Sequence, residues 1–404
     1  MKKIIFIILI SVLLMLMVGM SILSINKQLT KDKSKTENTI DNINEQENIE
    51  KEIFSEHYGK AMGKLETLSQ EEKIAQLFVI GMSNNSDLEE LKNYQFGGYL
   101  FFKDFFDNKT EEQVKQTIDN FQKNADIPLL IAIDEEGGRV VRASSNSKLA
   151  KEPFKSPSEL YKNGGLEAIK QDTIKKSMFL ERLGINLNFA PVVDIATNSE
   201  DYMFKRALQE GKELTAEYAK TVISASKGYK VSYTLKHFPG YGSNKDTHTG
   251  SSQDERTYEE IYNNDLEPFR AGIEVGAEVV MVSHNLVTSI DENNPASISK
   301  EVHNLLREEL KFSGIIITDD INMGAIKNEY TVSDSIVKAI QAGNDMIIIT
   351  IDRNSKDKIT NTKIDYKTVI ESVKNALEKG EITDNDIDTA LHRILAWKYY
   401  KGLM

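Results

Sequence analysis

The stretch GIIITD, residues 314–319, is a short β-branched run that ends in a carboxylate. Seven similar apolar runs lie between helix-length segments, at residues 77–81, 97–102, 128–134, 185–192, 231–237, 278–284 and 345–350. Aliphatic runs that alternate with helical patterns are typical of parallel strands buried on both faces. Eight such units predict an α/β fold, a (β/α)8 TIM-type barrel, with a doubly wound open sheet as the alternative.

Polar residues occupy the carboxyl ends of four of these runs. They are Asp134, Lys236 with His237, His284 and Asp319. In a barrel the carboxyl ends of all strands face one mouth, where barrel enzymes build their active sites. One such residue alone could simply pair with a neighbouring helix N-terminus. Five at one mouth predict a catalytic constellation.

Composition limits the classes of function. The 404-residue chain has a formal net charge of -12 and no strongly basic run. This argues against nucleic acid as a partner, because phosphate contacts need a clustered basic surface. The chain contains no cysteine, which excludes disulfides, thiolate metal sites and a cysteine nucleophile.

The N-terminus predicts export. Residues 4–25 form an uncharged apolar run that follows two lysines. As a helix, such a run is long enough to cross the hydrocarbon layer of a bilayer, and the lysines should stay on the cytoplasmic side. We expect residues 1–25 to be a transmembrane anchor or a signal peptide, cleaved near residues 19–21 in the second case. Both readings predict an extracytoplasmic protein, membrane-anchored or secreted.

The rest of the chain divides into a linker and one body. Residues 26–55 are mostly Lys, Asn, Glu, Thr and Asp, a composition that predicts a disordered polar linker because it cannot bury enough apolar surface. We expect residues 56–404 to form a single catalytic domain. Ser69 and Glu72 are spaced as a capping box that opens a helix, with Phe78 on the apolar side of that helix.

Longer stretches carry a resemblance to a known family. They are DEEGGRVVR (134–142), NFAPVVDI (188–195), KHFPGYG (236–242), DTH (246–248), VMVSHNLV (280–287), IITDDINM (316–323) and AIQAGNDM (339–346). In this order, from about residue 65 to residue 404, the chain resembles the N-acetyl-β-glucosaminidase branch of glycoside hydrolase family 3. The resemblance implies a barrel that hydrolyses terminal β-linked N-acetylglucosamine with retention, without a metal or an organic cofactor.

The resemblance also implies roles for single residues. Asp319 matches the nucleophile of the family, His248 its acid/base and Asp246 the carboxylate that orients this histidine. A carboxylate nucleophile gives a covalent glycosyl-enzyme, and an imidazole with a pKa near ~6.5 can both give and take a proton. The implied contacts to sugar hydroxyls are Asp134, Arg142, Arg206, Lys236 and His237.

Neighbouring positions carry further expectations. Asp320 should point away from the substrate and cap the next helix, and His284 should support the catalytic set from behind. The loop with the DTH motif should close over the sugar, with Gly240 and Gly242 as its flexible points. Tyr241 stands where the family commonly has histidine.

Several alternatives stay open. A phosphorylase could use the same site, because a histidine acid/base does not repel a phosphate anion, and a β-glucosidase would share the fold. A substrate-assisted hexosaminidase could use the Asp134–Glu135 pair, although the following Gly-Gly-Arg favours a binding turn. A metal-dependent barrel hydrolase could use the histidines and Asp319, although no HxH or HExxH pair is present. The remaining alternative is an inactive, membrane-tethered lectin.

Overall fold

The computed structural model describes residues 52–82, 93–242, 246–247 and 250–404. The chain divides into two compact units, Met1–Ser55 and Glu56–Met404, and the barrel lies in the second. Within the described residues no helix has both the length and the apolar character needed to cross a membrane. The predicted anchor at residues 4–25 lies outside this part of the chain.

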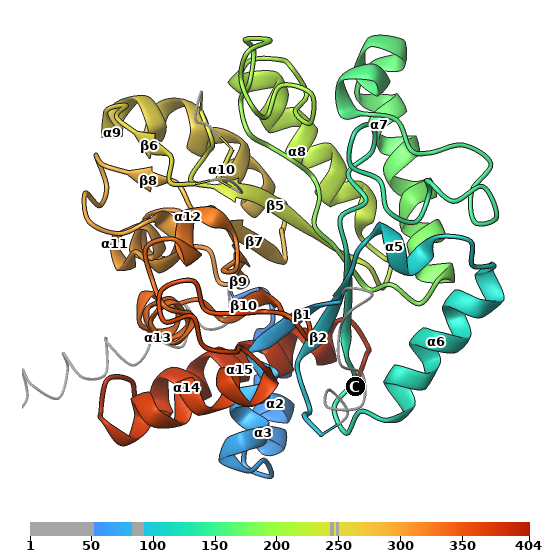
Figure 1. Ribbon diagram of the computed structural model, residues 1–404. Helices are drawn as coiled ribbons and strands as arrows, with labels where there is room; N and C mark the ends of the chain where they lie inside the picture. Colours follow the sequence, from blue (N-terminus) through green and yellow to red (C-terminus); the bar gives the residue numbers. More distant parts are fainter. Residues whose placement is uncertain (1–51, 83–92, 243–245, 248–249) are drawn as a thin grey trace, which may run out of the picture. The chain divides into compact units, whose positions relative to one another are not determined.

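Eight parallel strands form a closed barrel in the order β1-β10-β9-β7-β5-β4-β3-β2 (Figure 1). The barrel strands are β1 Phe78–Met82, β2 Gly98–Phe101, β3 Leu130–Ile133, β4 Leu187–Asn188, β5 Ser232–Phe238, β7 Val279–Val282, β9 Ile315–Asp320 and β10 Met346–Thr350. A separate two-stranded parallel sheet pairs β6 Gln253–Asp254 with β8 Leu286–Val287. The predicted (β/α)8 barrel is therefore confirmed, and the alternative prediction of a doubly wound open sheet is wrong.

Burial explains why the strands could be recognised in the sequence. Every residue of β1, β2, β3 and β7 is buried. Because one face of each strand packs into the barrel and the other lies under helices, these strands have no polar alternation. The register closes the barrel, with Phe78 opposite Ile347 of β10 and Val79 opposite Gly98 of β2.

Helices lie around the strands (Figure 1). The α-helices are α2 Tyr58–Leu65, α3 Gln70–Gln76, α5 Lys103–Phe106, α6 Glu111–Lys123, α7 Pro157–Arg182, α8 Lys212–Ser226, α9 Tyr258–Glu260, α10 Leu266–Glu274, α11 Lys300–Asn304, α12 Gly324–Lys327, α13 Val332–Ala342, α14 Tyr366–Glu378 and α15 Asp384–Tyr400. Short 3-10 or π segments occur at η2 Ile261–Asp265, η3 Ala296–Ile298 and η4 Leu305–Glu309.

Side-chain caps fix where several helices begin. The Ser69 side chain accepts the backbone N–H of Glu72, and the Glu72 side chain accepts the N–H of Ser69, which confirms the predicted capping box. The same reciprocal pattern opens α6 at Thr110 and α15 at Thr383. The expectation that Phe78 belongs to the apolar side of the helix opened by Ser69 is wrong, because α3 ends at Gln76 and Phe78 begins β1.

The strand ends bring the candidate residues to one mouth. Asp134 follows β3 directly, Lys236 and His237 lie near the end of β5, and Asp319 lies near the end of β9. Since all barrel pairs are parallel, these ends share one side of the barrel. The fold therefore places the predicted polar residues where barrel enzymes hold their substrates.

Candidate active site

A cavity of about 410 Å³ opens at this mouth. A volume of this size is typical of small-molecule sites. Its floor and walls include Phe102, Phe189 and Met281, and its polar lining includes Asp134, Glu136, Arg139, Arg142, Tyr202, Arg206, Lys236, His237, Tyr241, Asp319, Asp320 and Thr350. All five predicted sugar contacts and the predicted nucleophile are thus brought together.

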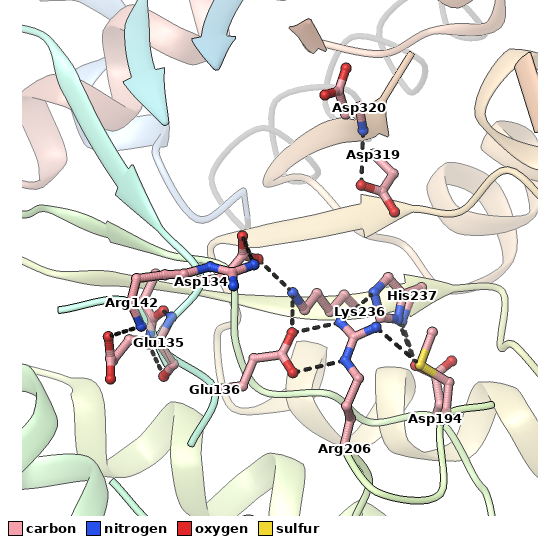
Figure 2. A network of polar contacts seen from close by, with 12 residues as sticks. Asp134, Glu135, Glu136, Arg142, Asp194, Arg206, Lys236, His237, Asp319 and Asp320 are labelled. Atoms are coloured by element: carbon pink, nitrogen blue, oxygen red, sulfur yellow. Dashed lines mark hydrogen bonds and ion pairs between the residues drawn. The ribbon is translucent and has the colours of Figure 1, made fainter. Parts of the chain in front are cut away.

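One side of the cavity is a network of ion pairs (Figure 2). The ammonium of Lys236 lies 2.9 Å from Asp134 Oδ1 and 2.7 Å from Glu136 Oε1. Arg206 binds the same Glu136 with two nitrogens, at 2.6 Å and 2.9 Å. Two cations and two carboxylates from three parts of the chain therefore hold each other in fixed positions.

Charge pairing keeps the buried groups of this network ionised. Burial works against ionisation of Glu136, but the charges of Arg206 and Lys236 outweigh it and hold the pKa of this carboxyl well below its ordinary range. Burial likewise disfavours the Lys236 ammonium, yet Asp134 and Glu136 raise its pKa above the ordinary value. The network is therefore a rigid set of charged donors and acceptors.

His237 is oriented by a buried carboxylate. Its Nδ1 lies 2.7 Å from Asp194 Oδ2, and its backbone N–H donates to the same oxygen at 3.2 Å. The other oxygen of Asp194 accepts the backbone N–H of Tyr241 at 2.8 Å. This leaves Nε2 of His237 toward the cavity, 3.4 Å from a nitrogen of Arg206.

Asp319 lies across the cavity from this network (Figure 2). Its Oδ1 accepts the backbone N–H of Asp320 at 2.8 Å. No group in the described part of the chain donates a hydrogen bond to its second oxygen. Asp319 therefore offers a carboxylate oxygen to a molecule in the cavity.

Electrostatics favour the ionised form of Asp319. Burial raises the pKa of this carboxyl, but the positive charges associated with His284, His237 and Lys236 outweigh burial, so its pKa lies below the ordinary value. The carboxyl is thus an anion at neutral pH. An anionic carboxylate with an unbonded oxygen can act as a nucleophile.

A comparison with known families gives this site its context. The model described as "Glycosyl hydrolase family 3 N terminal domain" matches residues 69–397. The chain belongs to glycosyl hydrolase family 3. The resemblance noted in the sequence is confirmed, and so is the expectation of a glycoside hydrolase.

Relatives of this family 3 chain carry related names. It is 30% identical to "Beta-hexosaminidase" of Nitrosomonas eutropha, over 68% of this chain and 79% of that one. It is 28% identical to "Beta-hexosaminidase LpqI" of Mycobacterium tuberculosis, over 82% and 83% of the two chains. A family 3 β-N-acetylglucosaminidase from Paenibacillus sp. str. FPU-7 superposes with a TM-score of 0.74 at 28% identity. That match covers 83% of this chain and 63% of the Paenibacillus protein.

The acidic stretch after β3 in the family 3 chain folds into a turn that separates its carboxylates. Asp134 faces the cavity and lies 3.7 Å from the Arg142 guanidinium. Glu135 is fully buried, and its carboxylate accepts the backbone N–H groups of Arg142 and Ala143 at 2.9 Å and 2.8 Å and the Ser144 hydroxyl. Because Glu135 is occupied by its own turn, it cannot act with Asp134 as a catalytic pair.

Asp320 does not cap a helix, contrary to expectation. The strand β9 includes Asp320, and the Asp320 carboxylate accepts the backbone N–H groups of Asn322 and Thr350 at 2.9 Å and 3.1 Å. The helix α12 begins later, with Met323 as its N-cap residue. Asp320 thus ties the turn after β9 to β10, and burial raises the pKa of its carboxyl.

His284 lies behind Asp319, as expected for a supporting residue. Its Nδ1 lies 2.7 Å from the Ser297 hydroxyl and its Nε2 lies 2.9 Å from the backbone oxygen of Asp320. Both ring nitrogens are engaged with protein oxygens, so neither is open to a metal ion in this arrangement.

The loop after β5 is described only in part. His248, the predicted acid/base, lies outside the described residues, whereas the neighbouring Asp246 is hydrogen-bonded to the Tyr202 side chain. Gly240 and Gly242 have φ values of 126° and 55°. A Cβ atom on either glycine would come within 2.6 Å of the side chain packed against it. Positive φ favours glycine at both positions, and at Gly240 the close approach of the Asp265 side chain does so as well.

Two acidic residues that hold the site together were not assigned a role from the sequence. Glu136 pairs with Lys236 and Arg206, and Asp194 orients His237. Each is an acidic residue a short distance beyond a strand end. That position was the available signal, since acidic residues at the barrel mouth are candidates for a polar site.

Proposed function

We propose that the chain is a retaining, exo-acting β-N-acetylglucosaminidase. The observation that carries this proposal is the Asp319 carboxylate, which lines a cavity of about 410 Å³ and has a lowered pKa. An ionised carboxylate at this place can attack an anomeric carbon and form a covalent glycosyl-enzyme. Ion-paired donors and acceptors on the opposite wall suit the hydroxyl groups of one terminal sugar.

The network has hydrogen-bonding capacity left for that sugar. An ammonium group carries three N–H donors, and Lys236 directs one each at Asp134 and Glu136. A third donor remains for a hydroxyl. Asp134 can accept from hydroxyls, while Arg142 and Arg206 donate from planar guanidinium groups.

The proposed reaction has two steps. In the first, an oxygen of Asp319 bonds to the anomeric carbon as the glycosidic C–O bond breaks, and His248 gives a proton to the leaving oxygen. In the second, water attacks the same carbon from the face that the leaving group left, His248 takes a proton from the water, and the Asp319 ester bond breaks. Two inversions restore the original β configuration. Asp246 would orient His248 through both steps.

The proposed substrate is terminal β-linked N-acetylglucosamine in cell-wall fragments or related glycans. The names of the relatives support this choice, since two are β-hexosaminidases and one is a β-N-acetylglucosaminidase. The proposed extracytoplasmic localisation also supports this substrate, because an exported enzyme would meet such glycans outside the cytoplasm.

The direct test compares nitrophenyl glycosides. We expect the N-acetyl-β-glucosaminide to be cleaved with a kcat/KM at least about tenfold above that of the matched β-glucoside. Proton NMR should show the β-anomer of free N-acetylglucosamine as the first product. A first product of α configuration, preference for the glucoside, or a sugar phosphate formed in phosphate buffer would each contradict the proposal.

We propose that residues 1–25 anchor the enzyme or direct its secretion and that residues 26–55 act as a tether. A chain that begins at Glu56, where the second compact unit starts, should then be soluble and monodisperse. Its kcat/KM should stay within about twofold of the full chain in detergent, because a tether adds no group to the site. A large loss of turnover would show that the removed segment contributes to the catalytic domain.

A further inference from the structure

Tyr241 makes an unusual contact at the edge of the cavity. Its side chain lines the cavity, yet only 1% of the residue is exposed. Its hydroxyl lies 2.5 Å from Thr247 Oγ1 and also accepts the backbone N–H of Thr247 at 3.0 Å. A single phenol oxygen therefore holds both the hydroxyl and the backbone N–H of Thr247, which is itself buried.

Thr247 is held from a second direction. Its backbone oxygen accepts the N–H of Ala325, in α12, at 3.0 Å. The helix α12 follows β9, the strand that carries Asp319. Thr247 is thus connected on one side to the segment after β5 and on the other to the segment after the proposed nucleophile.

Tyr241 is itself rigidly placed. Its backbone N–H donates to Asp194, the carboxylate that orients His237. Its ring packs in an apolar cluster with Ala196, Met203 and Ala207. The ring centroid lies 5.6 Å from that of His237. The phenol oxygen is therefore a fixed point of the site.

We propose that Tyr241 is a positioning residue for the acid/base step. Through Thr247 it fixes the adjacent Asp246, which also contacts Tyr202. The inference rests on the proposed function, in which Asp246 orients the acid/base. It assigns a use to the tyrosine that stands where the family commonly has histidine.

The variant Tyr241→Phe tests this proposal, because it keeps the ring and removes only the hydroxyl. The Thr247 N–H and hydroxyl then lose a partner in a buried place. A misplacement of about 1 Å can cost ~10²-fold in rate. We therefore expect kcat on a β-linked N-acetylglucosamine disaccharide to fall about 10- to 100-fold. The KM and the glycosylation rate on a dinitrophenyl glycoside, which needs little acid assistance, should change by less than about threefold.

Two further variants separate positioning from a loss of stability. Tyr233→Phe removes the hydroxyl of another buried tyrosine, which lies in β5 and is bonded to Ser177 outside the cavity, and should leave the ratio of the two rates unchanged. Thr247→Val removes one of the two contacts to Tyr241. Thr247→Val should lower the disaccharide rate in the same way as Tyr241→Phe, but by less. When the two changes are combined, the loss should be no larger than in Tyr241→Phe alone.

Several outcomes would overturn the inference. In folded Tyr241→Phe these outcomes are an unchanged kcat on the disaccharide, an equal loss of rate on the disaccharide and the dinitrophenyl glycoside, and a change in KM without a change in kcat. Additive effects of Tyr241→Phe and Thr247→Val would overturn it as well. If Tyr241→Phe does not fold, an equal loss of both rates in Thr247→Val would do the same. A wild-type enzyme without activity on N-acetylglucosaminides would instead contradict the proposed function, so the two failures can be told apart.

Discussion

Replacement of Asp319 by asparagine should lower turnover by roughly 10⁴-fold or more. Asparagine has nearly the same size and still accepts the Asp320 N–H, but it carries no charge to attack the anomeric carbon. The ion-paired wall formed by Asp134, Glu136, Arg206 and Lys236 is untouched by this change. Sugar binding, measured by calorimetry with N-acetylglucosamine, should therefore persist within about fivefold.

A mechanism-based fluorosugar gives the control. It should label the wild-type enzyme at Asp319 only, and peptide mass spectrometry would locate the ester. Asp320→Asn is the matched variant, because Asp320 adjoins the nucleophile but has one carboxylate oxygen occupied by two backbone N–H groups. It should still be labelled at Asp319. Labelling at Asp320, or persistent turnover in Asp319→Asn, would show that the nucleophile is misassigned.

The barrel could be predicted because burial acts on every residue of a parallel strand. Ile315, Ile316 and Ile317 of β9 are all fully buried, so the strand appears in the sequence as an uninterrupted apolar run. The parallel arrangement then puts the residues after each run at one mouth. Asp134, Lys236 and Asp319 could therefore be grouped without knowledge of any contact between them.

The partners within the site could not be predicted in the same way. Glu136 contacts Arg206, 70 positions away in the chain, and Asp194 contacts His237, 43 positions away. Both acidic residues lie in irregular segments, where no strand or helix period determines the direction of a side chain. Glu135 and Glu136 illustrate this, since one is bonded inside its own turn and the other faces the cavity.

The helix-cap interpretation of Asp320 failed for a related reason. An aspartate just before a helical segment is a common N-cap, but β9 continues through Asp320 and the chain turns before α12. Backbone N–H groups of the turn and of β10 are closer partners for this carboxylate. The local sequence was compatible with an N-cap at Asp320 and with a strand that continues through Asp320. The neighbouring strand β10 decides between these two alternatives.

Replacement of His248 by alanine should separate the two steps of the proposed reaction. A general acid matters most when the leaving oxygen is a poor leaving group, and its help is worth roughly 10²–10⁴-fold in such cases. We expect a loss of this size on a sugar–sugar bond, whereas glycosylation by a dinitrophenyl glycoside should be largely retained. The glycosyl-enzyme should then accumulate, because water still needs a base.

Azide and Asp246 provide the decisive comparisons for His248→Ala. Azide attacks without base assistance, so it should restore turnover of the activated glycoside and yield a β-glycosyl azide. Asp246→Ala should show a smaller loss on the sugar–sugar bond, because it removes only the residue that orients the acid/base. If His248→Ala slows both substrates equally and azide has no effect, the acid must be another residue.

Glu135 is bonded within its turn, and Arg206 and Lys236 keep the pKa of Glu136 low. Asp320, which lines the cavity and whose pKa is raised by burial, would then be the carboxylic acid to test.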